Sequence, residues 1–225
     1  AACAARPTAI SSSRLAKAPG RTLVPGAGLL SPSERPPSAP AFRFIAFGDT
    51  GTGDGAQYNL ANIMATHHRE SPFDTALLLG DNIYPDGNLS DVGAKFERPY
   101  SELLRRDVKF HAVLGNHDIR KGRDAQINYP NFNMGGRAYY SFTRGDGLVE
   151  FFALDSNDFN WPQKHWLETA LMASRAKWKI AYFHHPIYSS GKRHGSDLRL
   201  RAELEPLFLR YGVAAAFSGH DHTYE

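Results

Sequence analysis

The chain has 225 residues, of which 42% are hydrophobic and 22% charged, a composition that fits one globular domain with a substantial core. No apolar run is long enough to span a bilayer, and the single cysteine, Cys3, excludes an intrachain disulfide and a cysteine-based zinc site. The net charge of +3 comes from residues 1–40, so the rest of the chain is near neutral and does not predict a nucleic-acid-binding surface.

Residues 1–40 contain half of the 14 prolines, with alanine, serine and glycine between them and no periodic apolar pattern. This composition predicts a disordered leader or linker, followed by one folded domain over residues 41–225. The first three residues, AAC, are similar to the end of a lipoprotein signal, although an ordinary cysteine in an exposed tail is the favoured interpretation. The chain ends directly behind a predicted strand, so we expect the C-terminus to be incomplete and the last strands of the fold to be missing.

From Phe42 onward, apolar segments typical of strands alternate with segments of helical pattern. The predicted strands cover residues 42–47, 75–80, 108–115, 137–142, 148–155, 178–183 and 213–219. The predicted helices cover residues 56–70, 91–105, 161–174 and 197–211, and residues 119–147 are predicted to form a long excursion rich in glycine, asparagine, arginine and tyrosine. Strands that alternate with helices predict a layered α/β fold.

Five of the predicted strands end in polar clusters of similar character. These clusters are GDTG (48–51), GDNIY (80–84), GNHD (115–118), HHP (184–186) and GHDH (219–222). In an open α/β sheet, sites form where the carboxyl ends of the strands meet, so we expect the five clusters to converge. Together they offer carboxylates, an amide oxygen, imidazoles and a phenol but no thiolate, which favours iron, zinc or manganese.

The number of clusters indicates two metal ions rather than one. A single ion would not need five clusters, whereas two ions with one bridging carboxylate would use them all. His220 and His222 would point to opposite faces of an extended segment, but in a turn they can straddle two adjacent ions. Two such ions can activate a water molecule and clamp the oxygens of an in-line displacement at phosphorus.

The order of these motifs resembles the calcineurin-like metallophosphoesterase superfamily, from about Phe42 to the end of the chain. The tyrosine in GDNIY is similar to that of the purple acid phosphatase branch, especially its short tartrate-resistant type. The resemblance implies a four-layer αββα sandwich of two mixed sheets flanked by helices. It also implies hydrolysis of small phosphomonoesters by a metal-bound hydroxide, with Fe(III) beside Fe(II), Zn or Mn, and it favours export (periplasmic, secreted or lipid-anchored) over a cytoplasmic location.

The resemblance also implies which side chains bind the metals. The first metal would be held by Asp49, Asp81, Tyr84 and His222, and the second by Asp81, Asn116, His184 and His220, with Asp81 bridging. His184 is preferred to His185 because the family's ligand lies two residues before the matching proline, here Pro186. A phenol ionises at a pKa of about 10, so Tyr84 would ionise only for a strong Lewis acid, which predicts ferric iron and a coloured protein.

Two further histidines, His117 and His194, match residues that bind phosphate or protonate the leaving group in the family. We also expect Asp118 to fix the tautomer and orientation of His117, an inference of our own rather than a family rule. The remaining histidines have structural interpretations. His111 is predicted to pack within a strand, and His165 is predicted to lie on a helix surface.

Three other functions are open at this point. The runner-up is a metallophosphoesterase that acts on diesters or nucleotides. GTGDGA (51–56) fits a dinucleotide-binding fingerprint, but Asp49 and Asp54 would place negative charge beside a pyrophosphate. A catalytically silent binding protein would be expected to have lost some ligands, and all of them are present. The sequence leaves the oligomeric state and the physiological substrate open.

Overall fold

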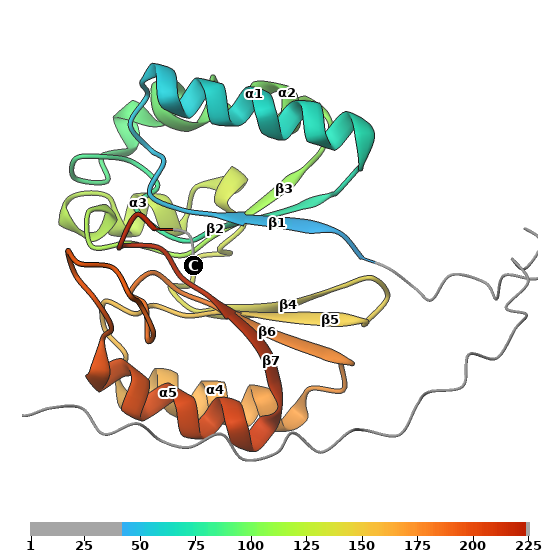
Figure 1. The fold of residues 1–225 in the computed structure, drawn as a ribbon, viewed down its shortest axis with the longest axis vertical. Coiled ribbons are helices and arrows are strands. Elements are labelled where there is room, and N and C mark those ends of the chain that lie inside the picture. The colour runs from blue at the N-terminus through green and yellow to red at the C-terminus, as the bar shows by residue number, and fades with distance from the viewer. Residues whose placement is uncertain (1–41, 224–225) are drawn as a thin grey trace, which may run out of the picture. The chain divides into compact units, whose positions relative to one another are not determined.

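We describe residues 42–223 of the chain in a computed structural model (Figure 1). The predicted leader and Cys3 lie outside the described residues, and the proposed export of the chain therefore stays a prediction. Among residues 42–223, no helix combines the length and the apolar character needed to cross a bilayer.

The first sheet has three parallel strands in the order β1-β2-β3. Its strands are β1 (Phe44–Phe47), β2 (Thr75–Leu78) and β3 (Lys109–Ala112). The central strand, β2, is buried throughout, as its continuous apolar sequence predicts for a strand covered on both faces. The helices α1 (Gly55–Glu70) and α2 (Ser101–Arg105) cover the outer face of this sheet (Figure 1).

The second sheet has four strands in the order β4-β5-β6-β7. Its strands are β4 (Tyr140–Arg144), β5 (Val149–Ala153), β6 (Trp178–Tyr182) and β7 (Val213–Phe217). β4 and β5 form an antiparallel hairpin, and the other pairs are parallel. The helices α4 (Trp161–Ala173) and α5 (Leu198–Tyr211) cover its outer face (Figure 1), which confirms the predicted α–β–β–α layering.

The inner faces of the two sheets pack against each other through aromatic side chains. The ring of Phe44 on β1 lies 5.0 Å from Phe151 on β5 and 5.9 Å from Phe217 on β7. The buried hydroxyl of Tyr140 donates to the carbonyl of Ala112 on β3 at 2.7 Å and lies 3.0 Å from the hydroxyl of Tyr182. The sheets therefore form one core, which fixes the carboxyl ends of their parallel strands relative to each other.

The long helices begin at side-chain caps that the sequence contains. Asp54, Asn160 and Asp197 each accept a hydrogen bond from the backbone N–H three residues later, at 2.9 to 3.1 Å. α5 ends at Tyr211 and is capped by Gly212, whose φ of 67° lies in the left-handed region that glycine adopts without strain. The predicted helix 56–70 begins one residue earlier, at Gly55.

Two predicted segments differ in detail from the structure. The helical stretch 91–105 is divided into a short 3-10 turn η2 (Leu89–Asp91), a π-helical turn η3 (Gly93–Glu97) and α2. The break between η3 and α2 lies at Pro99, which has no N–H to continue a helical hydrogen-bond ladder. The predicted excursion contains the 3-10 turns η4 (Asp118–Arg120) and η5 (Pro130–Phe132) and the helix α3 (Arg123–Ile127). Phe132 within it is fully buried, so this segment is part of the core.

Candidate dimetal centre

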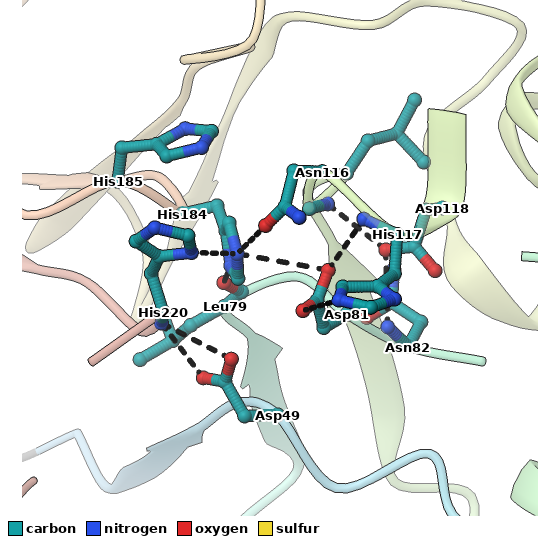
Figure 2. A network of polar contacts seen from close by, with 12 residues as sticks. Asp49, Leu79, Asp81, Asn82, Asn116, His117, Asp118, His184, His185 and His220 are labelled. Atoms are coloured by element: carbon teal, nitrogen blue, oxygen red, sulfur yellow. Dashed lines mark hydrogen bonds and ion pairs between the residues drawn. The ribbon is translucent and has the colours of Figure 1, made fainter. Parts of the chain in front are cut away.

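The five polar clusters converge at the carboxyl ends of β1, β2, β3, β6 and β7, as the sequence predicts. Figure 2 shows that side chains from both sheets point into one space, with Asp49 and Asp81 from the first sheet facing His184 and His220 from the second. Carboxylate and imidazole atoms of Asp49, Asp81 and His184 lie within 4.8 Å of one another, close enough to share a metal ion.

Four of these residues have a strained backbone. Asp49, Asp81, His220 and His222 adopt φ angles of 58°, 52°, 72° and 52°, in the left-handed region. This conformation costs a residue with a Cβ atom about 1–2 kcal/mol. Strain of this kind clusters at functional sites, where the surrounding structure holds it in place.

Two glycines let the backbone approach these carboxylates closely. A Cβ atom added at Gly115 would lie 2.1 Å from Asp81 Oδ1, and one added at Gly219 would lie 2.4 Å from Asp49 Oδ2. Both distances are too short for real contacts. The glycines of GNHD and GHDH are therefore required by the packing of the site.

Asp49, Tyr84 and His222 form one group of mutually close polar atoms. The hydroxyl of Tyr84 lies 3.4 Å from Asp49 Oδ1 and 3.2 Å from His222 Nε2, and this nitrogen lies 3.5 Å from Asp49 Oδ1. The backbone N–H of His220 donates to both Asp49 oxygens, at 2.9 and 3.1 Å. This donation orients the carboxylate toward the phenol and the imidazole.

A second group forms around the fully buried ring of His184. Its Nδ1 donates to the carbonyl of Leu79 at 2.8 Å, so Nε2 of the neutral ring is an acceptor. This Nε2 faces Asn116 Oδ1 at 3.1 Å, His220 Nδ1 at 3.2 Å and Asp81 Oδ1 at 3.6 Å. Neither oxygen has a hydrogen to share with the nitrogen, so a cation fits between these atoms.

Burial sets the protonation of the side chains in both groups. Burial, together with the nearby charge of Asp81, raises the pKa of Asp49 to about 7. Burial lowers the pKa of His184 and of His220 to about 4, so both rings are neutral near pH 7. Neutral imidazoles are ready metal ligands, and a bound cation would favour the ionised form of Asp49. Burial also raises the pKa of the Tyr84 phenol, beside Asp49.

The two groups open into a cavity of about 650 Å³, which His117 and His194 also line. Nε2 of His117 lies 4.0 Å from Asp81 Oδ2, and the ring of His194 lies 4.0 Å from that of His220. Six of the seven predicted metal ligands and both predicted phosphate-contacting histidines thus line one cavity. The seventh ligand, His184, is fully buried behind the wall, with Nε2 3.1 Å from Asn116 Oδ1. Their roles in metal and phosphate binding stay predictions.

The prediction that Asp118 orients His117 is wrong. Nδ1 of His117 instead lies 2.6 Å from the carbonyl of Pro85. The buried carboxylate of Asp118 accepts from the backbone N–H groups of Asn82 and Gly115, at 3.0 and 2.9 Å. It also accepts from Ile83 N at 3.1 Å and from Gln126 Nε2 at 3.0 Å. Asp118 therefore connects the GDNIY and GNHD loops by hydrogen bonds. This role could not be read from the sequence, because it depends on the tertiary contacts of the carboxylate.

Sequence reasoning missed the polar residues that follow β5. The hydroxyl of Ser156 accepts from the backbone N–H groups of His184 and His185, at 3.2 and 3.0 Å, and lies 2.9 Å from His185 Nδ1. His185 therefore turns toward Ser156. His184 instead faces Asp81 (Figure 2). Asp155 is buried and pairs with Arg123 at 2.7 Å. The sequence does contain a pattern that indicates this polar cluster, because LDSND (154–158) follows an apolar run in the same way as the five predicted clusters.

Comparison with known proteins places this site in a family. A model of the calcineurin-like phosphoesterase family matches residues 42–224. Tartrate-resistant acid phosphatase type 5 of Homo sapiens is 30% identical over 235 residues, which cover 88% of this chain and 72% of that protein. Purple acid phosphatase 17 of Arabidopsis thaliana is 30% identical over 212 residues, which cover 81% of this chain and 62% of that protein.

Two solved structures share the fold. GAP50, described as the anchor in the inner membrane complex of Plasmodium, aligns with a TM-score of 0.67 and 26% identity over 80% of this chain and 66% of that one. A dimetal phosphatase from Danio rerio aligns with a TM-score of 0.66 and 17% identity over 82% of both chains, which shows the fold alone. The match over the whole described domain, the acid phosphatase relatives and the geometry of the site agree. The chain belongs to the calcineurin-like phosphoesterase family of metal-dependent phosphoester hydrolases.

Proposed function

We propose that this chain is an acid phosphatase-like hydrolase of phosphomonoesters that uses two metal ions. One observation carries the proposal: Asp81 lies between two groups of potential ligands, and six of the seven predicted ligands line the same cavity. Ligand atoms of Asp81, of Asp49 in the first group and of His184 in the second group all lie within 4.8 Å of one another, so Asp81 can contribute to both groups. The acid phosphatase relatives support the choice of a monoester as substrate.

The ligand sets follow from the two groups. Asp49, Asp81, Tyr84 and His222 would hold the first metal, and Asp81, Asn116, His184 and His220 would hold the second. When bound, the two ions would polarise the phosphate oxygens and lower the pKa of a water molecule. The donor chemistry, oxygen and nitrogen without sulfur, suits Fe(III) beside Fe(II), Zn or Mn.

The chain's own hydrogen bonds orient these ligands. Leu79 fixes the tautomer of His184 so that Nε2 faces the site. The backbone N–H of His117 donates to Asp81 Oδ1 at 2.9 Å, which fixes the bridging carboxylate. Partners of this kind raise metal affinity because they remove the freedom that each ligand would lose on binding.

We assign His117 and His194 to the phosphate and the leaving group. Nδ1 of His117 donates to Pro85, so the proton that the ring can gain or lose is at Nε2, on the side of Asp81. An imidazolium there would stabilise negative charge on the phosphate and could protonate the departing alkoxide. The exposed ring of His194 approaches from the opposite sheet, beside His220.

A metal count together with a matched pair of substrates tests this function. We expect two metal ions per chain and hydrolysis of 4-nitrophenyl phosphate in preference to bis(4-nitrophenyl) phosphate. Asp81→Asn should lower kcat/KM by more than about a hundredfold and reduce the metal content, because an amide offers a single neutral oxygen and cannot bridge the two ions. Asp124→Asn, an exposed change on α3, is the matched control.

The outcomes separate the alternatives. Preference for the diester would establish the runner-up activity. A folded protein with neither metal nor turnover would refute the proposal and favour a silent binding protein. The Plasmodium neighbour, described as an anchor, shows that the fold alone does not decide between these functions.

A further inference from the structure

Two arginines line the cavity beside the metal-binding groups. Arg120 and Arg193 are both exposed side chains in its wall. Across residues 42–223, neither forms an ion pair with a carboxylate. Arg120 makes one long hydrogen bond, from Nη1 to the carbonyl of Pro85 at 3.3 Å. Both guanidinium groups therefore retain most of their donors.

Two cations close to Arg120 along the chain are already neutralised, in contrast to Arg120 itself. Lys121, next to Arg120, pairs with Asp86 at 2.5 Å, and Arg123 pairs with buried Asp155. Among residues 42–223, the cavity wall contains no carboxylate other than those of Asp49 and Asp81, the two predicted metal ligands. Apart from the predicted metal ligands and the histidines, the charged side chains of the cavity wall are therefore the two arginines.

The loop that carries Arg193 is held in place by Asp221, which is buried between the two histidines of GHDH. Its carboxylate accepts from Ser189 Oγ at 2.5 Å, from His194 N at 3.1 Å and from Gly195 N at 3.0 Å. A Cβ atom at Gly191 would lie 2.0 Å from Asp221 Oδ2, so the loop packs directly on this carboxylate. The backbone that bears Arg193 is thus fixed relative to the metal groups.

The backbone of Arg120 is likewise fixed relative to the metal-binding groups, by contacts that follow a strand of the first sheet. It ends η4, the turn that begins at Asp118, and Asp118 is the carboxylate that ties the two metal-binding loops together. One arginine therefore follows β3 of the first sheet, and the other follows β6 of the second. Both reach the cavity wall from fixed backbone, as a binding site for a defined group requires.

We propose that Arg120 and Arg193 bind a second anionic group of the substrate, so that the preferred substrate is a phosphomonoester whose alcohol portion also carries a carboxylate or a phosphate. This inference rests on the proposed hydrolase function. Guanidinium groups match the planar, bidentate geometry of such anions better than ammonium groups do. In the proposed function the metal ions and the two histidines bind the scissile phosphate. The two arginines are therefore available to bind another anionic group.

A pair of substrates that differ in one group tests the proposal on the full, metal-loaded chain. Glycerol 2-phosphate and 2-phosphoglycerate share the scissile ester, and the second has a carboxylate in place of a hydroxymethyl group. We expect kcat/KM to favour 2-phosphoglycerate by about tenfold, the size of one charge-assisted hydrogen bond. Because the site is exposed, the preference should shrink as the salt concentration rises.

The double substitution Arg120→Met and Arg193→Met should bring the ratio of the two kcat/KM values close to one. Arg199→Met is the matched control, because Arg199 is exposed and lies outside the cavity wall, and it should keep the ratio of the unsubstituted protein. Met preserves the length of the side chain and removes the charge.

Three results would overturn the inference. One is a ratio near one in the unsubstituted protein. Another is an equal loss on both substrates in the double variant, which would place the arginines on the scissile phosphate. The third is no turnover of either substrate by a folded, metal-loaded chain; if 4-nitrophenyl phosphate is not hydrolysed either, the proposed function is overturned as well.

Discussion

Asp118→Asn tests whether one buried carboxylate holds the two metal-binding loops together. Asp118 is fully buried and accepts hydrogen bonds from Asn82, Ile83, Gly115 and Gln126 at 2.9 to 3.1 Å. The asparagine side chain keeps only one of the two acceptor oxygens and has an NH₂ group in place of the other, so two of these four donors would face that NH₂ group. Each unsatisfied buried donor costs about 1–3 kcal/mol, which gives about 2–6 kcal/mol for the pair.

The assay is urea and thermal unfolding of the metal-free protein. For a domain of this size, about 2–4 °C is lost per kcal/mol, so Tm should fall by about 5–20 °C. Calorimetric titration should also show metal affinity reduced by about tenfold or more, since Asp81 and Asn116 adjoin the released backbone. Asp124→Asn, on the exposed face of α3, is the control. An Asp118→Asn protein as stable as this control would refute the reasoning.

Four further changes test other parts of the structure. Gly115→Ala should weaken metal binding by more than about tenfold, because its Cβ would displace the carboxylate of Asp81. Gly55→Ala, which has open space around it, is the control and should leave metal affinity unchanged. Equal metal affinity in the two variants would contradict this packing. Tyr84→Phe should abolish a visible absorption band, and an iron-free, colourless and active protein would count against ferric iron. Burial lowers the pKa of His111 to about 3, below its unfolded value of about 6.5, so its contribution to the free energy of unfolding is complete above pH 6.5 and falls by about 2 kcal/mol at pH 5. His111→Gln should therefore flatten the dependence of stability on pH, measured by urea unfolding at each pH. An unchanged dependence would show that other groups cause it. Asp221→Asn should lower kcat by about tenfold while metal content stays constant, because the loop of residues 189–195 loses its anchor, and loss of metal instead would show a different role.

The fold and the convergence of the site were predictable because each depends on local patterns. The β2 and β6 sequences are largely apolar and are followed by polar clusters, and strand ends of a parallel sheet meet at one edge. The break at Pro99 could have been predicted from proline chemistry, but the regular apolar spacing on either side of it favoured one helix. The partners of Asp118 could not be predicted, since they lie 3 to 36 residues away along the chain.

The sequence by itself determined the chemistry that the predicted metal ligands have available: two carboxylates, an amide, a phenol and three imidazoles at strand ends, with no thiolate among them. Motif order was sufficient to indicate a dimetal hydrolase because each side chain is adjacent to the strand that positions it. Only the tertiary structure decided how these groups face one another. His184 Nε2 becomes an acceptor because Leu79, 105 residues earlier, accepts from Nδ1. Arg120 and Arg193 line one cavity because the packing of two sheets brings their loops together, and no local pattern contains that information.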